Sequence, residues 1–226
     1  MIWSAIKGIV PETGLIVGDH LKEYFGVSFE NFGVISGPCH AEEVAMERLS
    51  YLTLCSLNKA QAQILKTSMQ QDYITCSISE DFIGAEYAAV LKNIYAIAAG
   101  IAHGLGYGDN FQAVLISNAI REMNRFIKKI HKTKRNINAS AYLGDLLVTA
   151  YSTFSRNRMF GTMLGKGYTV KAAMMEMNMI AEGYYAVKSA YKMASKKTLI
   201  ITAVYDIVYN SMNPKEVITR LTNQLD

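Results

Sequence analysis

The stretch EYAAVLKNIYAIAAG, residues 86–100, decides the fold of the second part of the chain. It is apolar almost all the way round a helix, yet it carries a lysine near its middle. With about 3.6 residues per turn, Lys92 shares its face with small residues that are typical of close packing, namely Ala85, Ala88, Ala89, Ala96 and Ala99. Burial disfavours the charged ammonium, so we expect a lowered pKa and an amine that exchanges protons near neutral pH. The alternative is a lysine whose stem follows the helix until the amine reaches water.

Long helical patterns dominate the chain from this stretch onward. We predict helices over residues 85–103, 109–130, 140–152, 155–164, 169–176, 181–194, 199–210 and 214–224. The first 80 residues instead alternate β-rich runs with amphipathic segments. The expected strands are MIWSAI (1–6), FGVIS (32–36), YLTLCS (51–56) and YITCSIS (73–79), and the helices between them cover 14–26, 40–50 and 59–71.

This alternation predicts a mainly parallel sheet with crossover helices. We therefore predict an α/β plus all-α fold, in which a partial Rossmann-like parallel sheet precedes a multi-helix substrate domain. Residues 1–81 form the C-terminal portion of a Rossmann-like domain, and residues 82–226 form the all-helical domain.

Composition indicates a soluble, cytoplasmic protein. Half of the 226 residues are hydrophobic, and the three cysteines (Cys39, Cys55 and Cys76) have neither CxxC nor Cys/His spacing, which fits a reducing compartment and predicts no metal site. No signal peptide is evident at the N-terminus. Lys92 and Asn93 interrupt the longest apolar helix, so we expect no membrane span.

A basic run, RFIKKIHKTKRN, covers residues 125–136 and carries much of the net charge of +4. Such a run is either a nucleic-acid contact or a solvated helix end whose cations face the negative pole of the helix dipole. It follows an amphipathic helix and precedes a polar loop, which favours the solvated helix end and no nucleic-acid partner.

The segment YLGDLLVTAYSTFSRNRMFG, residues 142–161, has the pattern of an anion site. Asp145 and Thr149 lie four residues apart and share one helix face. Ser155 is placed to cap a helix that begins at Arg156, where free backbone N–H groups, two arginines and Asn157 favour a phosphate group. The alternative is a capped helix with a basic first turn.

Two strand ends carry further candidates. In SGPCHAEE, residues 36–43, Gly37 permits close backbone approach and Cys39 or His40 is a candidate polar contact, although a lone histidine is more often structural. In AIKG, residues 5–8, Lys7 directly follows a strand, where open α/β sheets bind ligands. The alternative for Lys7 is an ordinary exposed lysine.

The sequence has no GxGxxG turn after a strand in residues 1–80, the pattern that a dinucleotide-binding half requires. GLGYGD, residues 104–109, follows a helix and does not qualify.

Five segments in order resemble the NAD(P)-dependent glycerol-3-phosphate dehydrogenases of bacterial type. They are AIKG, SGPCHAEEVA, GAEYAAVLKNIYAIAAGIAHGLGYGDN, YLGDLLVTAYSTFSRNRMFG and IAEGYYAVKSA, and the resemblance covers nearly the whole chain. Cys39 and His40 depart from the family, which has Ser or Thr and then Phe. Ala96 stands where the related β-hydroxyacid dehydrogenases have Asn.

The resemblance implies hydride transfer between glycerol 3-phosphate and NAD or NADP, giving dihydroxyacetone phosphate, and a place in glycerophospholipid metabolism. It implies that Lys92 is the general acid/base, assisted by Asp145 and Lys7. The implied substrate contacts are Lys7, Gly37, Cys39, Lys92, Asn93, Asp145, Thr149, Ser155, Arg156 and Asn157. The implied cofactor contacts are Lys7, Ala41, Arg156, Ile180 and Glu182.

The family opens with a strand and GxGxxG turn that the sequence does not show, so the chain resembles an N-terminally truncated enzyme. Whether it is active alone stays open at this point, as does the choice between NAD and NADP. The exposed edge of a partial sheet predicts self-association, with a homodimer as one form. The alternative function is a non-catalytic helical binding or oligomerisation module derived from the same fold.

Overall fold

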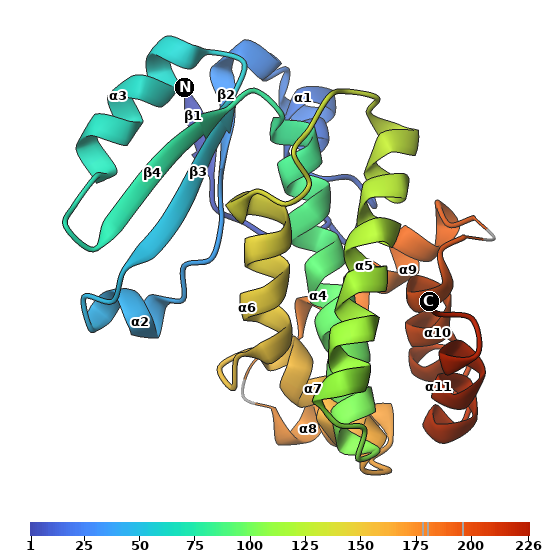
Figure 1. Cartoon of the computed structure of the whole chain (residues 1–226). Helices are drawn as coiled ribbons and strands as arrows, with labels where there is room; N and C mark the ends of the chain where they lie inside the picture. Colours follow the sequence, from blue (N-terminus) through green and yellow to red (C-terminus); the bar gives the residue numbers. More distant parts are fainter. Residues whose placement is uncertain (178, 180, 196) are drawn as a thin grey trace. The chain divides into compact units, whose positions relative to one another are not determined.

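The computed structural model describes residues 1–177, 179, 181–195 and 197–226 (Figure 1). Contacts divide the chain into two compact units, which are described separately. The first unit contains Met1–Ala89 and Ile130–Asp145, and the second contains Val90–Lys129 and Leu146–Asp226. The predicted domain boundary between residues 81 and 82 stays a prediction.

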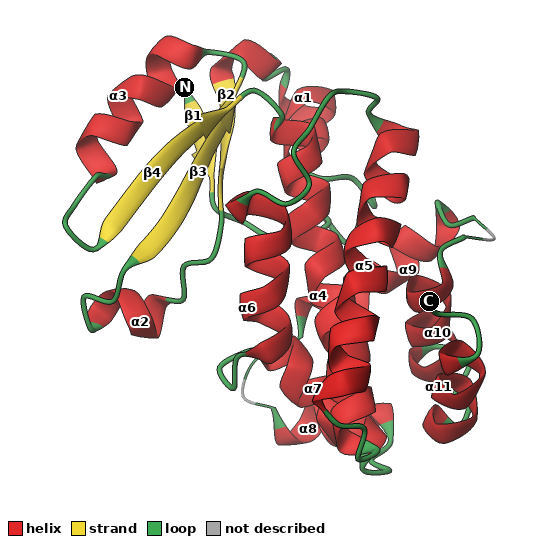
Figure 2. Cartoon of the chain, viewed as in Figure 1, coloured by secondary structure: helices red, strands yellow, loops and turns green. Residues whose placement is uncertain are grey.

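Strands lie in the first 80 residues and helices dominate the remainder (Figure 2). The strands are β1 (Ile2–Ser4), β2 (Phe32–Ser36), β3 (Ser50–Ser56) and β4 (Ile74–Ser79). The helices are α1 (Val17–Phe25), α2 (Ala41–Ala45), α3 (Lys59–Met69), α4 (Phe82–Gly104), α5 (Asp109–Ile130), α6 (Asp145–Tyr151), α7 (Arg156–Gly165), α8 (Val170–Glu176), α9 (Glu182–Lys192), α10 (Leu199–Val208) and α11 (Pro214–Thr222). A 3-10 turn covers Phe29–Asn31 and a π-helical turn covers Ser140–Gly144. The predicted fold class is confirmed.

Within the described residues, the strands form one sheet in the order β1-β2-β3-β4. β1 and β2 pair in parallel, as do β3 and β4. The β2 and β3 pair is antiparallel, with Val34 opposite Cys55. The expectation of a mainly parallel sheet with crossover helices is therefore wrong at this connection. The segment between β2 and β3 contains the five-residue α2, which buries no residue and so cannot act as a crossover helix packed on the sheet.

The two faces of the sheet bury different hydrophobic clusters in the first unit. On one face, Val34 and Cys55 pack with residues from α1 and the start of α4. On the other face, Leu52, Leu54 and Cys76 pack with Leu65 and Met69 of α3. Leu54 and Cys55 are consecutive in β3, so side-chain alternation along a strand sends them to opposite faces.

The start of α4 is fixed by Asp81, whose carboxylate accepts the Gly84 N–H at 3.1 Å. The same carboxylate accepts hydrogen bonds from Arg135 Nε at 2.7 Å and from the Tyr142 hydroxyl at 2.6 Å. Arg135 belongs to the basic run, but its side chain is only 3% exposed. This arginine therefore pairs with the partly buried cap residue Asp81 and does not belong to a solvated helix end.

In the second unit, α4 and α7 approach so closely that only glycine fits at their contact. A Cβ on Gly100 would collide with the carbonyl oxygen of Arg158, and a Cβ on Gly161 would collide with that of Ile97. Ala96 and Ala99, on the lysine-bearing face of α4, are fully buried. The small residues of the opening stretch are therefore part of a tightly packed helix.

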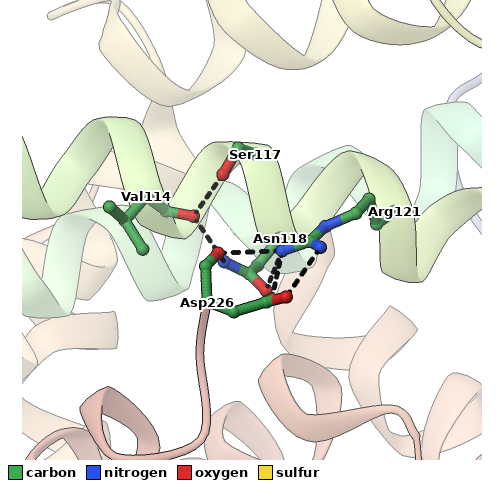
Figure 3. A network of polar contacts seen from close by, with 5 residues as sticks. All are labelled: Val114, Ser117, Asn118, Arg121 and Asp226. Carbon is green, nitrogen blue, oxygen red and sulfur yellow. Dashed lines mark hydrogen bonds and ion pairs between the residues drawn. The ribbon is translucent and has the colours of Figure 1, made fainter.

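The last residue, Asp226, is attached to α5 by a polar network (Figure 3). Its backbone oxygen accepts hydrogen bonds from Asn118 Nδ2 at 2.8 Å and Arg121 Nη2 at 2.9 Å, and its carboxylate pairs with the same arginine. The network holds residues after α11 against the middle of α5.

None of the described helices is both long and apolar enough to cross a membrane. The predicted cytoplasmic location and self-association stay predictions.

Candidate active site

Lys92 lies in α4 and is buried, with 6% of its surface exposed. Its Nζ donates a hydrogen bond to Thr149 Oγ1 of α6 at 3.1 Å, and Thr149 is equally buried. The alternative in which the amine reaches water is therefore wrong. Ala88 and Ala96, one turn away on either side, are buried as well. The predicted lowering of the Lys92 pKa stays a prediction.

The next residue, Asn93, begins a polar chain that ends at an arginine. Asn93 Nδ2 donates to Glu182 Oε2 at 3.1 Å, and Glu182 Oε1 lies 3.5 Å from Arg156 Nη2. Asn93 is buried, whereas the Glu182 and Arg156 side chains are 47% and 40% exposed. These contacts hold the accessible Arg156 guanidinium near α4, the helix that carries Lys92.

The first turn of α7 has the cap that the sequence predicts. Ser155 Oγ accepts the Arg158 N–H at 3.3 Å. Asn157 is buried, and its Oδ1 accepts the Gly183 N–H at 2.9 Å. The side-chain oxygen of Asn157 is thus occupied by a contact between α7 and α9. A ligand at the start of α7 would meet the side-chain nitrogen, Nδ2. Gly183 permits this contact because a Cβ there would lie 2.8 Å from the Asn93 carbonyl oxygen.

A second cluster, in the first unit, surrounds Lys7. Lys7 Nζ lies 3.5 Å from Asp145 Oδ2 and donates to the Gly37 carbonyl oxygen at 3.3 Å. Asp145 is 2% exposed and begins α6 directly after the π-helical turn. Gly37 has φ +119°, and a Cβ there would collide with the carbonyl oxygen of Tyr51, so only glycine fits. Lys7 is therefore paired and not an ordinary exposed lysine.

The remaining predicted residues lie near the loop after β2. Cys39 is a partly buried free thiol, His40 precedes α2, and Ala41 is the exposed first residue of that helix. Ile180 lies outside the described residues. The structure thus brings Lys92, Asn93, Thr149, Arg156 and Glu182 into contacts within one unit. It brings Lys7, Gly37 and Asp145 together in the other.

The sequence interpretation missed Ser36, the last residue of β2. Its side chain is 1% exposed, and its Oγ has no hydrogen-bond partner among the described residues. A buried hydroxyl without a partner is uncommon and indicates a place for a further polar group. In the sequence, Ser36 is marked only by its position between a strand and Gly37-Pro38.

Two family models match the chain. One, described as NAD-dependent glycerol-3-phosphate dehydrogenase C-terminus, matches residues 81–219. The other, described as the N-terminus of the same family, matches residues 1–62.

Curated relatives agree with these models. The glycerol-3-phosphate dehydrogenase [NAD(P)+] of Oceanobacillus iheyensis is 34% identical over 223 residues, which are 97% of this chain and 65% of the relative. The protein of the same name from Staphylococcus aureus is 34% identical over 219 residues, 95% of this chain and 66% of the relative. The chain thus spans just under two thirds of the length of these relatives.

A solved structure extends the comparison to three dimensions. The crystal structure of glycerol-3-phosphate dehydrogenase from Coxiella burnetii has a TM-score of 0.91 and 29% sequence identity, and the match covers 98% of this chain and 68% of that one. With the family model for the C-terminus alone matching more than half of the sequence, the chain belongs to the NAD-dependent glycerol-3-phosphate dehydrogenase family.

Proposed function

We propose that this chain acts in the interconversion of sn-glycerol 3-phosphate and dihydroxyacetone phosphate with NAD or NADP. The observation that carries the proposal is the buried Lys92 amine, held by Thr149 Oγ1 at 3.1 Å. A nicotinamide cofactor, when bound, would supply or accept the hydride at substrate C2. The names of the curated relatives support this activity.

The proposed role of Lys92 is proton transfer at the C2 oxygen. Oxidation of the alcohol requires a base that removes the hydroxyl proton, and reduction of the ketone requires an acid that returns it. An amine in a water-poor environment loses part of the solvation that favours its charged form, so both protonation states become accessible. Thr149 would fix the position of Nζ, and Asn93 would contact the substrate from the same helix.

The proposed phosphate site is the first turn of α7. Arg156 is accessible, and a guanidinium binds phosphate oxygens with two parallel hydrogen bonds. Ser155 caps the helix, whose positive dipole end also favours an anion. Glu182 would orient the Arg156 guanidinium toward the phosphate. Asn157 would donate a hydrogen bond to the phosphate from its Nδ2.

Lys7, Gly37, Cys39 and Asp145 are proposed to contact substrate, with Lys7 also near the nicotinamide. The Asp145 carboxylate is proposed to act with Lys92 in catalysis and with the substrate hydroxyls. It is buried and lies within an ion-pair distance of Lys7, and electrostatic interactions are stronger in a buried site than in water.

The residues fit the nicotinamide end of the cofactor. The buried Ser36 hydroxyl, which has no partner among the described residues, suits a carboxamide or ribose group, and Lys7 is adjacent to the same loop through Gly37. Ala41, Arg156, Ile180 and Glu182 are proposed cofactor contacts. The sequence has no GxGxxG turn after a strand, so no residue is assigned to the pyrophosphate.

The proposal is tested by substrate binding and by turnover. We expect calorimetric binding of glycerol 3-phosphate that Arg156→Gln weakens about tenfold or more, since a bidentate contact to phosphate is lost. We also expect NADH oxidation with dihydroxyacetone phosphate, reduced about 10²–10⁴-fold in Lys92→Met while binding persists. Lys59→Ala is the control, because this lysine is 68% exposed and pairs only with Glu80 among the described residues.

The two readouts separate the parts of the proposal. Binding that depends on Arg156 supports the phosphate site whether or not the isolated chain turns over. Turnover that survives Lys92→Met would contradict the proton-transfer role. If neither binding nor turnover is detected for the folded wild-type chain, the proposal is wrong.

A further inference from the structure

The π-helical turn Ser140–Gly144 directly precedes Asp145, whose carboxylate is buried. In this turn the Gly144 N–H donates to the Ala139 carbonyl oxygen at 3.4 Å, and the Asp145 N–H donates to that of Ser140. Each of these bonds spans five residues instead of the four of an α-helix, so the turn holds one extra residue. An uninterrupted α-helix would place the following residues about 100° away around its axis. The turn therefore sets the direction in which the Asp145 side chain points.

Contacts with other parts of the first unit hold this turn, which is an uncommon conformation. At its start, Ser140 Oγ lies 3.4 Å from Thr53 Oγ1 of β3, and either hydroxyl can donate. At its centre, Tyr142 is 5% exposed and its hydroxyl donates to Asp81 Oδ2 at 2.6 Å. The turn is thus tied to the sheet and to the residue that caps α4.

Asp81 is a fixed point for this tyrosine. Its carboxylate accepts the Gly84 N–H of α4 at 3.1 Å and two N–H groups of Arg135 at 2.7 and 3.2 Å. Burial raises the pKa of Asp81, but hydrogen bonds from Arg135 and Tyr142 outweigh this effect and lower the pKa below its ordinary value. The carboxylate is therefore charged at neutral pH, and hydrogen bonds to charged acceptors are shorter and stronger than neutral ones.

The pair between Lys7 and Asp145 is loose by comparison. Lys7 Nζ lies 3.5 Å from Asp145 Oδ2, and the same amine donates to the Gly37 carbonyl oxygen at 3.3 Å. The Lys7 side chain is also 26% exposed, so water competes for the amine. The backbone of the turn therefore contributes to the position of the carboxylate.

We propose that Tyr142 is a positioning residue for Asp145. Its hydroxyl, bound to Asp81, keeps the π-helical turn in the geometry that places the Asp145 carboxylate beside Lys7. Tyr142 acts only through this carboxylate. The placement of Asp145 is a property of the folded chain, whereas its consequence for substrate rests on the proposed function.

The first measurement is labelling of Lys7 with acetic anhydride, read by mass spectrometry against the exposed Lys59. Only a neutral amine is acylated, and a nearby carboxylate favours the charged form. Tyr142→Phe removes the hydroxyl and keeps the ring, and we expect it to raise the labelling rate of Lys7 about two- to fivefold. Asp145→Asn should raise the rate at least as much. Tyr142→Phe should then add nothing in the Asp145→Asn background.

The second measurement is the calorimetric dissociation constant for glycerol 3-phosphate in the same set of variants. We expect Tyr142→Phe to weaken binding about three- to tenfold, and to have no further effect once Asp145→Asn is present. A general structural defect would instead weaken binding in both backgrounds alike. Tyr24→Phe is the control, because this tyrosine is 61% exposed and keeps its ring contact with His20.

Unchanged labelling of Lys7 in Tyr142→Phe would overturn the inference, and so would equal effects with and without Asp145→Asn. A change in labelling without a change in binding would overturn the consequence for substrate. If the wild-type chain does not bind glycerol 3-phosphate, the proposed function fails, and the labelling cycle still decides whether Tyr142 places Asp145. Asp81→Asn weakens the same contact from its other side, so the test remains if Tyr142→Phe does not fold.

Discussion

Each of the two units contains a buried glutamate that stabilises the start of a distant helix, but the two carboxyl groups differ in their partners. In the first unit, Glu86 of α4 receives the Gly18 N–H of α1, shared between both carboxyl oxygens at 3.2 Å each. In the second unit, Glu122 of α5 receives the Ile200 N–H at 3.0 Å on one oxygen and the Ile201 N–H at 3.1 Å on the other. Neither helix has a side-chain cap from its own first residue.

The surroundings shift the two pKa values by different amounts. Burial raises the pKa of Glu86 to about 8, and the negative charge of Asp19 adds to the effect. Burial raises the pKa of Glu122 to about 7, while the N–H donors of α10 and the charge of Arg125 act in the opposite direction. Both carboxyl groups receive backbone N–H donors, but the charge of Asp19 raises the pKa of Glu86 whereas the charge of Arg125 lowers that of Glu122.

The largest expected effect comes from removing the carboxyl groups. Glu122→Ala leaves two buried N–H groups without partners, so we expect it to lower the free energy of unfolding by about 3–5 kcal/mol. Glu86→Ala removes the acceptor of the Gly18 N–H, and burial already disfavours its charged form more strongly, so it should cost about 1–3 kcal/mol. Urea unfolding at neutral pH measures both.

Glu80→Ala is the matched control for both variants. The Glu80 side chain is 58% exposed and pairs with the exposed Lys59, so we expect a change within about 0.5 kcal/mol. If Glu86→Ala lowers the free energy of unfolding as much as Glu122→Ala does, the two carboxyl groups do not differ in the way proposed.

The next effect is the pH dependence of stability. Both folded-state pKa values lie above the ordinary value of 4.5, so the folded chain holds these protons more tightly than the unfolded chain. The free energy of unfolding therefore falls as pH rises above 4.5, until about 7 for Glu122 and about 8 for Glu86. The slope is at most about 1.4 kcal/mol per pH unit for each proton.

Glutamine variants separate the two contributions, because the amide does not titrate. Urea unfolding at a series of pH values should show that Glu86→Gln removes the fall between about pH 7 and 8. Glu122→Gln should leave that part unchanged and flatten the fall at lower pH. If Glu122→Gln instead removed the fall between about pH 7 and 8, Glu122 and not Glu86 would have the higher pKa, and the comparison would be wrong.

Local patterns made much of the fold predictable. The predicted range 109–130 coincides with α5, since an apolar stripe with helical period specifies a long helix by itself. The direction of β3 was not predictable, because no property of its own residues records which way the preceding loop turns. The predicted helix 140–152 begins with a π-helical turn, which depends on packing around it.

The candidate site was predictable where one helix defines it. The alanines that share a helix face with Lys92 favour its burial, and Lys92 is buried in the structure. The partners of Glu86 and Glu122 could not be found this way, because they lie 68 and 78 residues away in the sequence. The bond from Gly183 to Asn157 likewise joins two helix starts that are separate in the chain.

The smallest expected effect is a change of opposite sign in the two pKa values when their charged neighbours are neutralised. Asp19→Asn removes a like charge and should lower the pKa of Glu86 by about half a unit to one unit. Arg125→Gln removes an opposite charge and should raise the pKa of Glu122, by less, because the arginine is exposed and solvent screens it. NMR titration of the glutamate carboxyl carbons measures both shifts, and each variant serves as the control for the other carboxyl group. If neither variant shifts the pKa of its glutamate, the neighbouring charges have no part in the difference between the units.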